Sequence, residues 1–216
     1  MDIVLILANG VWADDADARR RSFEAGFVIA VDGGYAKALS SGARVDLVVG
    51  DLDSLSRASE QALLASPVAV RRYPAAKDWS DLELALDEAL ARRPEKIVVL
   101  GALGGRLDQT LTNVHLLERG LRERIPIELA DRLRSVVLID GRHDVTGAAI
   151  GDSVSLVPIS ESARVTTNGL LYALRDEVLQ RAASRGVSNV VTELPVIVDA
   201  LDGTLLVIHE RAEVAS

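Results

Sequence analysis

Short apolar runs alternate with segments of helical spacing over the first two thirds of the chain. The apolar runs are rich in Val, Ile and Leu and stop at a glycine or a polar residue, as strands buried on both faces do. We expect such strands at residues 3–8, 27–31, 46–49, 68–73, 97–100, 127–130 and 136–139. The absence of an alternating apolar and polar pattern in them favours a sheet that is covered on both sides.

The segments between these strands carry helix signals. Ser80 and Glu83 have the capping-box spacing, in which each side chain can accept a hydrogen bond from the backbone N–H of the other residue at the start of a helix. The apolar residues behind that start keep helical spacing: Leu82, Ala85, Leu86, Ala89 and Leu90. We also expect helices around residues 19–21, at 35–41 and at 107–119, the last with Gly120 as its C-cap.

This alternation predicts an N-terminal α/β/α domain with a parallel sheet, over residues 1–140. Ligands of such sheets bind outside the carboxyl ends of the strands. The polar and glycine-rich signals follow those ends: Asn9-Gly10, Asp32-Gly33-Gly34, Gly50-Asp51-Leu52-Asp53, Lys77-Asp78 and Gly101 to Arg106. We therefore expect an active site along this edge of the sheet.

The pattern changes near residue 141, where long helical segments give way to short β-like runs. These runs lie at residues 154–157, 164–167, 189–191, 196–198 and 204–209, with glycines and Pro158 between them. They predict a smaller C-terminal antiparallel β-sandwich domain over residues 141–216. Residues 175–184 read as a helical or loop insertion within it.

Composition and charge narrow the function classes. The chain of 216 residues has no cysteine, which excludes disulfides, thiolate zinc sites and a cysteine nucleophile. The formal net charge of −8 argues against nucleic acid as a partner. The first apolar run is too short for a membrane span and lacks a basic flank, so we expect neither a signal peptide nor a membrane association. A cytoplasmic location is the resulting prediction.

Asp51 and Asp53 are the strongest candidates for chemistry. They are spaced i and i+2 after a buried strand, so an extended turn lets their carboxylates converge. Like charges about 5 Å apart repel by roughly 1–3 kcal/mol, and a hard cation such as Mg²⁺ relieves this. Asp81 or Asp78 could complete the site. The alternatives are a solvated loop with two helix-capping acids and, for Asp81, an acid that complements the helix dipole.

The glycines of residues 101–105 lead into a helix and suit a close approach of backbone to phosphate. A tight strand-to-helix turn is the alternative. Arg106 and Lys77 could add positive charge there. No Ser-His-Asp set is visible, and His115, His143 and His209 read as structural or surface residues. The nucleophile is therefore expected to come from the substrate.

Taken in order, these motifs resemble the thiamine pyrophosphokinase family over nearly the whole chain. The resemblance is carried by Asp32-Gly33-Gly34, Gly50 to Ser54, Lys77 to Glu83, Gly101 to Asp108, Ser155 to Pro158, Asn168 to Leu174 and Gly186 to Asn189. It implies transfer of a diphosphoryl group from ATP to the hydroxyl of thiamine, with Mg²⁺, giving thiamine diphosphate and AMP. It also implies a homodimer with shared sites.

The resemblance assigns roles to residues of this chain. Catalytic roles fall on Asp51, Asp53, Asp78 and Asp81, of which Asp51, Asp53 and Asp81 would hold the metal. The nucleotide site would comprise Asp32, Gly33, Gly34, Lys77, Gly104, Gly105, Arg106 and Asp108. Thiamine would meet Tyr172, Ser188 and Asn189, with the Tyr172 ring stacked on it.

Three departures from the family pattern leave alternatives open. Gln109 stands where His is frequent, and Ser80 where Thr is common. Leu171 and Ala173 stand where Lys and Pro are frequent, which touches affinity for thiamine. The alternatives are the same transfer to another hydroxymethyl heterocycle, such as a pterin, and a non-catalytic nucleotide-binding sensor.

Overall fold

The chain divides into two compact units, residues 1–132 and 133–216. The structure, a computed structural model, describes residues 2–12, 14–74, 76 and 78–212. Lys77, a predicted nucleotide contact, lies outside the described residues. The boundary between the units lies at 132/133, earlier in the chain than the predicted 140/141, because the apolar run at 136–139 belongs to the second unit.

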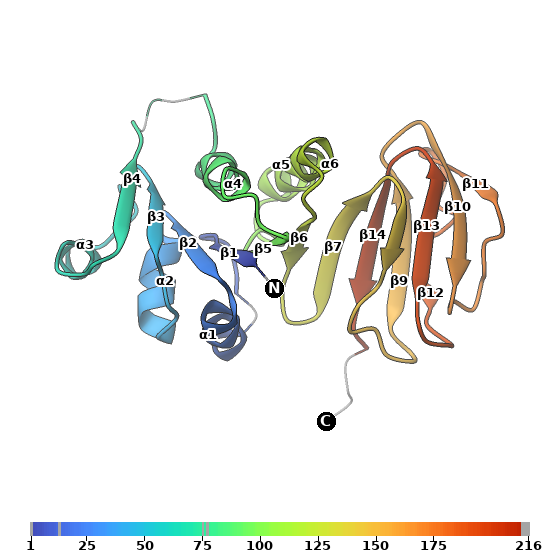
Figure 1. Ribbon diagram of the computed structural model, residues 1–216, viewed down its shortest axis with the longest axis horizontal. Helices are drawn as coiled ribbons and strands as arrows, with labels where there is room; N and C mark the ends of the chain where they lie inside the picture. Colours follow the sequence, from blue (N-terminus) through green and yellow to red (C-terminus); the bar gives the residue numbers. More distant parts are fainter. Residues whose placement is uncertain (1, 13, 75, 77, 213–216) are drawn as a thin grey trace. The chain divides into compact units, whose positions relative to one another are not determined.

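The first unit is built on six parallel strands in the order β6-β5-β1-β2-β3-β4 (Figure 1). Their bounds are β1 Ile3–Leu7, β2 Phe27–Val31, β3 Leu47–Gly50, β4 Ala69–Arg72, β5 Lys96–Leu100 and β6 Ile127–Ala130. All six lie where the apolar runs predict them. The predicted parallel sheet is therefore confirmed.

Helices cover both faces of this sheet (Figure 1). One face carries α1 Asp15–Glu24, α2 Gly34–Ser41 and α3 Arg57–Leu64, and the other carries α4 Asp81–Leu90, α5 Leu107–Leu116 and α6 Glu118–Glu123. The core under α1 and α2 includes Leu5, Leu7 and Val28. On the opposite side α4 buries Ala85, Leu86 and Ala89, which is the apolar stripe that the sequence predicts.

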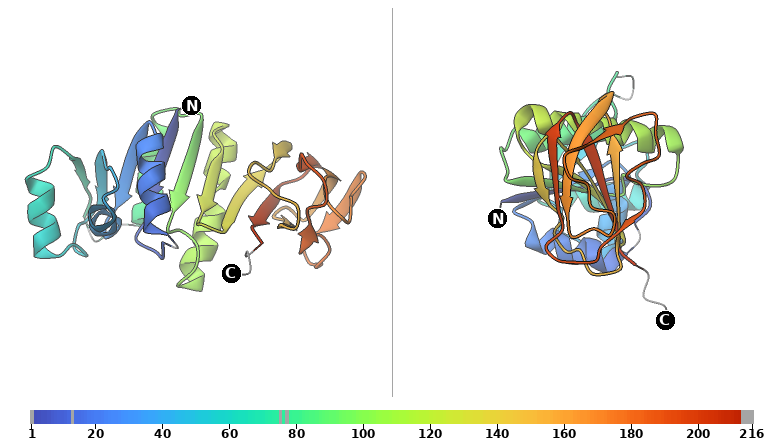
Figure 2. Two further views of the ribbon diagram at one scale, coloured as in Figure 1. Left: turned by 90° about the horizontal axis from the view of Figure 1, so that it is seen from below. Right: turned by 90° about the vertical axis from the view of Figure 1, so that its right-hand side faces the viewer.

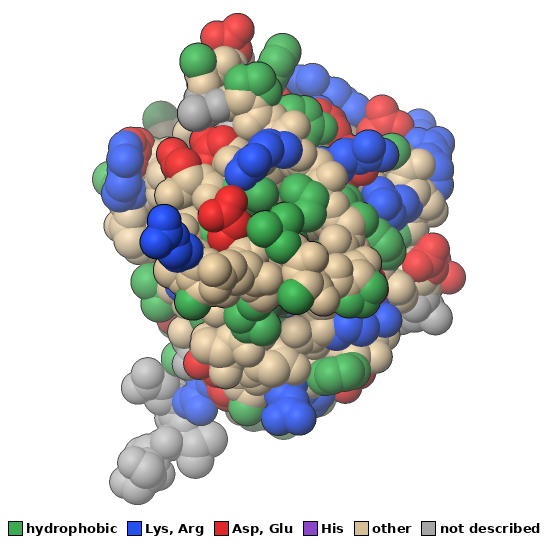
Figure 3. Space-filling view, turned by 90° about the vertical axis from the view of Figure 1, so that its left-hand side faces the viewer, with side chains coloured by type: hydrophobic (Ala, Val, Ile, Leu, Met, Phe, Trp, Pro, Cys, Tyr) green, Lys and Arg blue, Asp and Glu red, His purple; other side chains and the backbone are tan. Residues whose placement is uncertain are grey.

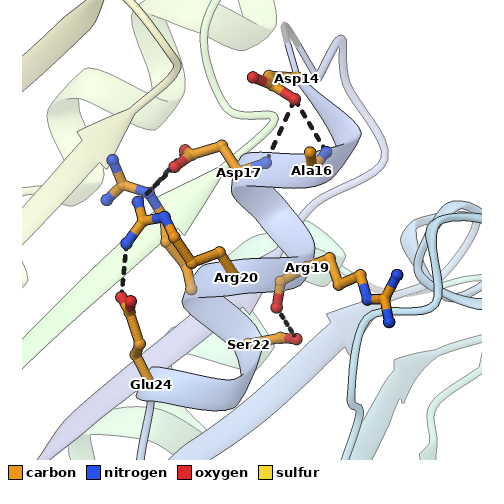
Figure 4. Close-up of polar contacts among 8 residues, drawn as sticks. Asp14, Ala16, Asp17, Arg19, Arg20, Ser22 and Glu24 are labelled. Carbon is orange, nitrogen blue, oxygen red and sulfur yellow. Dashed lines mark hydrogen bonds and ion pairs between the residues drawn. The ribbon is translucent and has the colours of Figure 1, made fainter.

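Helix α1 begins directly after the loop that follows β1. Asp14 caps it, accepting hydrogen bonds from the backbone N–H of Ala16 at 2.8 Å and Asp17 at 3.2 Å (Figure 4). Arg20 then pairs with Asp17 at 2.5 Å and with Glu24 at 2.7 Å along the exposed side. These contacts fix where the loop after β1 ends.

Strand β4 forms an exposed edge of the sheet, and all four of its residues are exposed. Its arginines pair with acids of flanking helices, Arg71 with Glu88 at 3.5 Å and Arg72 with Glu60 at 3.7 Å. The face at this end of the sheet shows basic and acidic side chains interspersed among hydrophobic ones (Figure 3). Charged side chains on an edge strand discourage pairing with another chain.

The predicted helix at 107–119 is wrong at its end. Helix α5 stops at Leu116, α6 follows at once, and Gly120 lies inside α6. The cap is Arg124, with a left-handed φ of 55°. A Cβ at position 120 would lie 2.6 Å from the carbonyl oxygen of Ile125. Glycine is therefore required here by close packing and not by a role as a helix cap.

The second unit consists of two antiparallel sheets in the orders β12-β9-β14-β7 and β11-β10-β13-β8 (Figures 1 and 2). Their bounds are β7 Arg134–Ile139, β8 Arg142–Asp144, β9 Ser153–Pro158, β10 Ser162–Asn168, β11 Glu177–Gln180, β12 Asn189–Val190, β13 Ile197–Asp202 and β14 Leu205–Glu210. Inward residues of both sheets form one core, for example Leu156, Val165 and Leu205. The predicted antiparallel β fold is confirmed.

The prediction for residues 175–184 is wrong, because this segment contains strand β11. It pairs with β10, Val165 lying opposite Glu177. Leu179 is fully buried while its neighbour Val178 is 48% exposed, which is the alternation of a strand on a sheet surface.

His209 and Asp152 form a buried pair in the second unit. Nε2 of His209 on β14 lies 2.8 Å from Oδ2 of Asp152. The backbone N–H groups of Ala149 and Ala212 also donate to this carboxylate, at 2.8 and 2.9 Å. Burial works to raise the pKa of Asp152, but the hydrogen bonds outweigh it and the pKa is lowered. The pair thus ties β14 to the turn before β9.

Within residues 2–12, 14–74, 76 and 78–212, no helix has both the length and the apolar character needed to cross a bilayer.

Candidate functional site

The loops after β1, β2 and β5 approach one another closely at the carboxyl edge of the parallel sheet. A Cβ on Gly10 would lie 2.1 Å from the carbonyl oxygen of Gly101, and a Cβ on Gly34 would lie 2.2 Å from the carbonyl oxygen of Leu7. Only glycine leaves room for such contacts. The residues that the sequence predicts for the site are therefore brought to one edge by backbone packing.

Three carboxylates converge at this edge. Asp32, Asp51 and Asp53 each offer an oxygen, and these oxygens all lie within 4.8 Å of one another. The backbone N–H of Asp53 donates to Oδ1 of Asp51 at 3.0 Å, which closes the turn. Asp32 and Leu52 both have left-handed backbone, with φ of 47° and 69°. Such residues cost free energy and cluster at functional sites.

The carboxylates repel one another. The pKa of Asp53 is raised, first by a hydrogen bond shared with Asp51 and by the Asp51 charge, then by burial and the charges of Asp32 and Asp81. Oδ1 of Asp32 is buried, and no described residue donates a hydrogen bond to it. Clustered carboxylate oxygens with an unsatisfied acceptor are the donor set that Mg²⁺ prefers, so these residues fit the ion.

The cluster contains two of the three predicted metal ligands, Asp51 and Asp53. Asp32, predicted for the nucleotide site, joins them because β2 and β3 are neighbours in the sheet. Asp81 lies outside the group of three, yet its charge contributes to the raised pKa of Asp53. A metal role for Asp81 stays a prediction, as does a catalytic role for the exposed Asp78.

A cavity of about 480 Å³ opens at the same strand ends. Its wall comes from the loop after β1, the end of β2, the start of α4, the loop after β5 and helix α5. The lining residues are Ala8, Asn9, Gly10, Val31, Asp32, Ser80, Asp81, Leu82, Gly101, Ala102, Gly104, Asp108, Gln109, Thr112 and Asn113. Four predicted site residues are among them: Asp32, Asp81, Gly104 and Asp108.

The start of α4 is fixed by Ser80, which is one half of the predicted capping box, whereas the Glu83 carboxylate pairs with Arg119 at 2.6 Å. Oγ of Ser80 accepts a hydrogen bond from the backbone N–H of Glu83 at 3.2 Å. Asp81 is the first residue of the helix. The cap therefore determines where the Asp81 carboxylate lies on the cavity wall.

The glycine-rich loop is held by the helix that follows it. Gly104 and Gly105 are exposed and left-handed, with φ of 79° and 73°. Thr110 donates to the carbonyl oxygen of Gly104 at 3.1 Å, and Asn113 donates to that of Ala102 at 2.9 Å. The sequence contains the glycine signal, but it does not indicate that α5 side chains brace the loop.

Arg106 and Asp108, both predicted for the nucleotide site, bind each other. Nε of Arg106 lies 3.1 Å from Oδ1 of Asp108, and Nη2 lies 2.6 Å from Oδ2. Both side chains are well exposed. Exposed ion pairs are worth about 0–1 kcal/mol, so an anionic ligand can compete for Arg106.

Asn9 and Lys37 are further residues at the site that sequence reasoning did not assign. Nζ of Lys37, on α2, donates to the carbonyl oxygens of Asn9 at 2.6 Å and Gly10 at 2.5 Å. Burial lowers the pKa of Lys37. The only sequence signal is the Asn9-Gly10 turn itself, since nothing in the pattern connects Lys37 to it.

The three residues predicted for thiamine lie together in the second unit. Asn189 is buried, and its side-chain amide accepts from the N–H of Tyr172 at 3.0 Å and donates to the Tyr172 carbonyl at 2.8 Å. Tyr172 is 69% exposed. Ser188 is exposed, and its N–H donates to Oγ of Ser155 at 2.9 Å. Asn189 therefore holds the backbone that presents the Tyr172 ring.

Two family models match the chain. "Thiamin pyrophosphokinase, catalytic domain" matches residues 20–129, and "Thiamin pyrophosphokinase, vitamin B1 binding domain" matches residues 140–204. The pterin and sensor alternatives gain no support from these matches.

Individual relatives agree with the family models. Thiamine pyrophosphokinase of Bacillus subtilis is 31% identical over 163 residues, which are 74% of this chain and 76% of the relative. Thiamine pyrophosphokinase 1 of Arabidopsis thaliana is 28% identical over 170 residues, 74% of this chain and 63% of the relative.

Solved structures are similar over nearly their full length. The crystal structure of the Bacillus subtilis enzyme has a TM-score of 0.86 at 26% identity and covers 97% of this chain and 99% of its own. That of thiamin pyrophosphokinase from Geobacillus thermodenitrificans has a TM-score of 0.83 at 29% identity, with 99% and 100% covered.

Proposed function

Because the chain belongs to the thiamine pyrophosphokinase family, we propose that it transfers a diphosphoryl group from ATP to the hydroxyl of thiamine. The products are thiamine diphosphate and AMP. The observation that carries the proposal is the convergence of Asp32, Asp51 and Asp53 beside a cavity of about 480 Å³ lined by Gly104 and Asp81. Phosphoryl transfer depends mainly on positioning and on electrostatic stabilisation, which is what such a site provides.

The reaction assigns a task to each group. Asp32, Asp51 and Asp53 would hold Mg²⁺, with Asp81 near them. When bound, the ion withdraws negative charge from the phosphate oxygens. The thiamine hydroxyl oxygen bonds to the β-phosphorus while the bond from that phosphorus to the α-phosphate oxygen breaks. No histidine is among the described residues that line the cavity, so a carboxylate is the group suited to accept the hydroxyl proton.

The glycine-rich loop is suited to the nucleotide phosphates. The exposed left-handed backbone at Gly104 and Gly105 permits close approach, and Arg106 can exchange Asp108 for a phosphate oxygen. Gly33, Gly34 and Lys77 remain predicted contacts of the nucleotide.

The exposed Tyr172 ring suits stacking on the cationic thiamine, with Ser188 beside it as a hydrogen-bonding group. Asn189 fixes the Tyr172 backbone and thereby its ring. The proposal retains the homodimer with shared sites and the cytoplasmic location expected from the sequence. Sedimentation equilibrium and cell fractionation test these two parts.

The proposed function is tested by measuring AMP formed from ATP with thiamine present and absent, and with Mg²⁺ present and removed by EDTA. We expect AMP only when both are present, with one thiamine diphosphate per AMP. A pterin alcohol serves as the comparison acceptor. Protein that binds Mg-ATP but forms no thiamine-dependent AMP would contradict the proposal.

A further inference from the structure

Lys37 lies in α2, and its ammonium group donates hydrogen bonds to backbone carbonyl groups. Nζ donates to the carbonyl oxygens of two consecutive residues, Asn9 at 2.6 Å and Gly10 at 2.5 Å. Both residues line the 480 Å³ cavity, whereas Lys37 does not. The cation therefore lies behind the cavity wall.

The peptides whose carbonyls Lys37 binds are those that carry the N–H groups of Gly10 and Val11. A trans peptide directs its N–H opposite to its C=O, so these two N–H groups point away from Lys37. No described residue accepts a hydrogen bond from either of them. Consecutive N–H groups that point to one side form an anion-binding concavity.

The cavity needs such donors. Its described lining contains three acids, Asp32, Asp81 and Asp108, and no Lys or Arg. A triphosphate entering it meets repulsion from these carboxylates. An ammonium bound to the carbonyl side of two peptides strengthens the donor side of the same peptides, since hydrogen bonds in a chain polarise one another.

We propose that Lys37 is a positioning residue that fixes and polarises the Gly10 amide, which belongs to the cavity wall, as a donor to the phosphate oxygens of ATP. The inference rests on the proposed function and adds this chain's own donors to it. The competing interpretation is that Lys37 only fastens α2 to the loop after β1.

The kinetic test compares Lys37→Met, which removes the charge, with Lys37→Arg, which keeps it. We expect Lys37→Met to raise KM for ATP about 10- to 100-fold, because hydrogen bonds to a charged ligand are the strong ones, with KM for thiamine unchanged. Lys37→Arg should stay within about threefold of the parent protein. Lys96→Met is the matched control, since Lys96 begins β5 and pairs with Glu128.

Calorimetric binding of Mg-ATP without thiamine separates this inference from the proposed function. Protein that binds Mg-ATP but makes no AMP contradicts the function and still allows the Lys37 variants to be compared by affinity. Active protein whose Lys37→Met variant keeps its ATP affinity overturns the inference. If Lys37→Met fails to fold, Lys37→Gln, which keeps a donor and loses the charge, takes its place and should weaken Mg-ATP binding by a similar factor.

Amide NMR observes the contact directly. Asn-Gly dipeptides occur only at 9–10 and 168–169, so labelling Asn with ¹³C′ and Gly with ¹⁵N selects two signals. The signal lost from Asn168→Ser belongs to Gly169. We expect the Gly10 amide to shift with ATP and with pyrophosphate, and not with adenosine. If the Gly10 signal does not shift with pyrophosphate, or if it shifts equally in Lys37→Met and in the parent protein, the inference is overturned. Lys37 then only fastens α2 to the loop after β1.

Discussion

At the scale of single residues, the site is marked by charge that the fold does not neutralise. Asp53 shares a hydrogen bond with Asp51 and feels the charges of Asp32 and Asp81, which together with burial raise its pKa. A carboxyl whose pKa is raised by folding destabilises the folded state once pH exceeds its ordinary value. The protonated Asp53 carboxyl does not destabilise the folded state in this way, and a bound cation would remove the repulsion that acts on the carboxylate.

Asp53→Asn is therefore expected to act in opposite directions on stability and on activity. It should lower kcat by about 10²-fold or more, because it removes a metal-binding charge and no core volume. Without divalent ions it should raise the melting temperature at pH 7 and lose that advantage below pH 4. Activity assays and thermal unfolding at several pH values measure this. A variant that keeps its turnover would show that Asp53 is only a loop acid.

Tyr172 is a test of ring stacking that leaves the core untouched. Tyr172→Ala should raise KM for thiamine about 5- to 100-fold, since stacking of a heterocycle on an aromatic ring is worth about 1–3 kcal/mol. Tyr172→Phe keeps the ring and should resemble the parent protein. Steady-state kinetics in thiamine, with ATP binding as the unaffected control, make the comparison. An unchanged thiamine KM in Tyr172→Ala would reject stacking.

Residues were predictable where the partners are close in sequence. The spacing of Asp51 and Asp53 is visible in the chain, and so is the glycine signal at 101–105. Asp32 joins the acids only because β2 lies next to β3, and Lys37 reaches Asn9 across 28 positions. Strand order and such long-range contacts are not encoded in local patterns.

At the scale of elements, helix starts position the chemistry. The cap at Ser80 places Asp81 on the cavity wall, and the N-terminus of α5 follows the glycine-rich loop. Both starts were predictable, because a capping box and a glycine run are local signals. The ends were less so. The break between α5 and α6 depends on the packing of Gly120 against Ile125, which no local pattern shows.

Ser80→Ala is expected to affect stability and activity together. Loss of the cap costs about 0.5–2 kcal/mol. Because the start of α4 carries Asp81, we also expect a higher Mg²⁺ requirement, by about 3- to 10-fold. Ser56→Ala is the matched control, since Ser56 caps α3 by accepting from Ser59 at 3.1 Å. Denaturant unfolding and Mg²⁺ titrations of activity decide the matter. If Ser80→Ala and Ser56→Ala require the same Mg²⁺ concentration, the Ser80 cap does not position Asp81 for the metal.

At the scale of the whole molecule, each unit contains its own core, and the second depends on a buried polar pair. Asp152 receives hydrogen bonds from His209, Ala149 and Ala212. These hydrogen bonds outweigh burial and hold its pKa below the ordinary range. The stability they contribute is fully present above the ordinary pKa of an aspartate and is lost as pH falls through the lowered pKa.

Asp152→Asn should destabilise the protein by about 3–5 kcal/mol, the cost of breaking a buried pair. The difference from the parent protein should shrink as pH falls below about 4, where the parent loses the contribution of the carboxylate. Asp144→Asn removes the exposed pair with Arg142 and should cost at most about 1 kcal/mol. Thermal unfolding between pH 3 and 8 measures both. A pH-independent difference would show that the charge of Asp152 is not what matters.

Fold class and the order of strands and helices along the chain could be predicted, because buried parallel strands and alternating surface strands leave different hydrophobic patterns. Strand β11 could not, since only the burial of Leu179 against the opposite sheet distinguishes it from a loop. The pairing of His209 with Asp152 spans 57 positions and left no local trace.

The crowding of backbone at the strand ends has a consequence for how this protein can vary. Gly10 and Gly34 cannot carry a side chain, because a Cβ at either position would clash with the backbone carbonyl oxygen of Gly101 or of Leu7. A saturation library scored only for cellular abundance, with no enzyme assay, should therefore accept glycine alone at both positions and accept many residues at Gly141, where open space surrounds the backbone. Such a library would locate the catalytic edge of the sheet by the positions that tolerate no substitution, without any substrate being added.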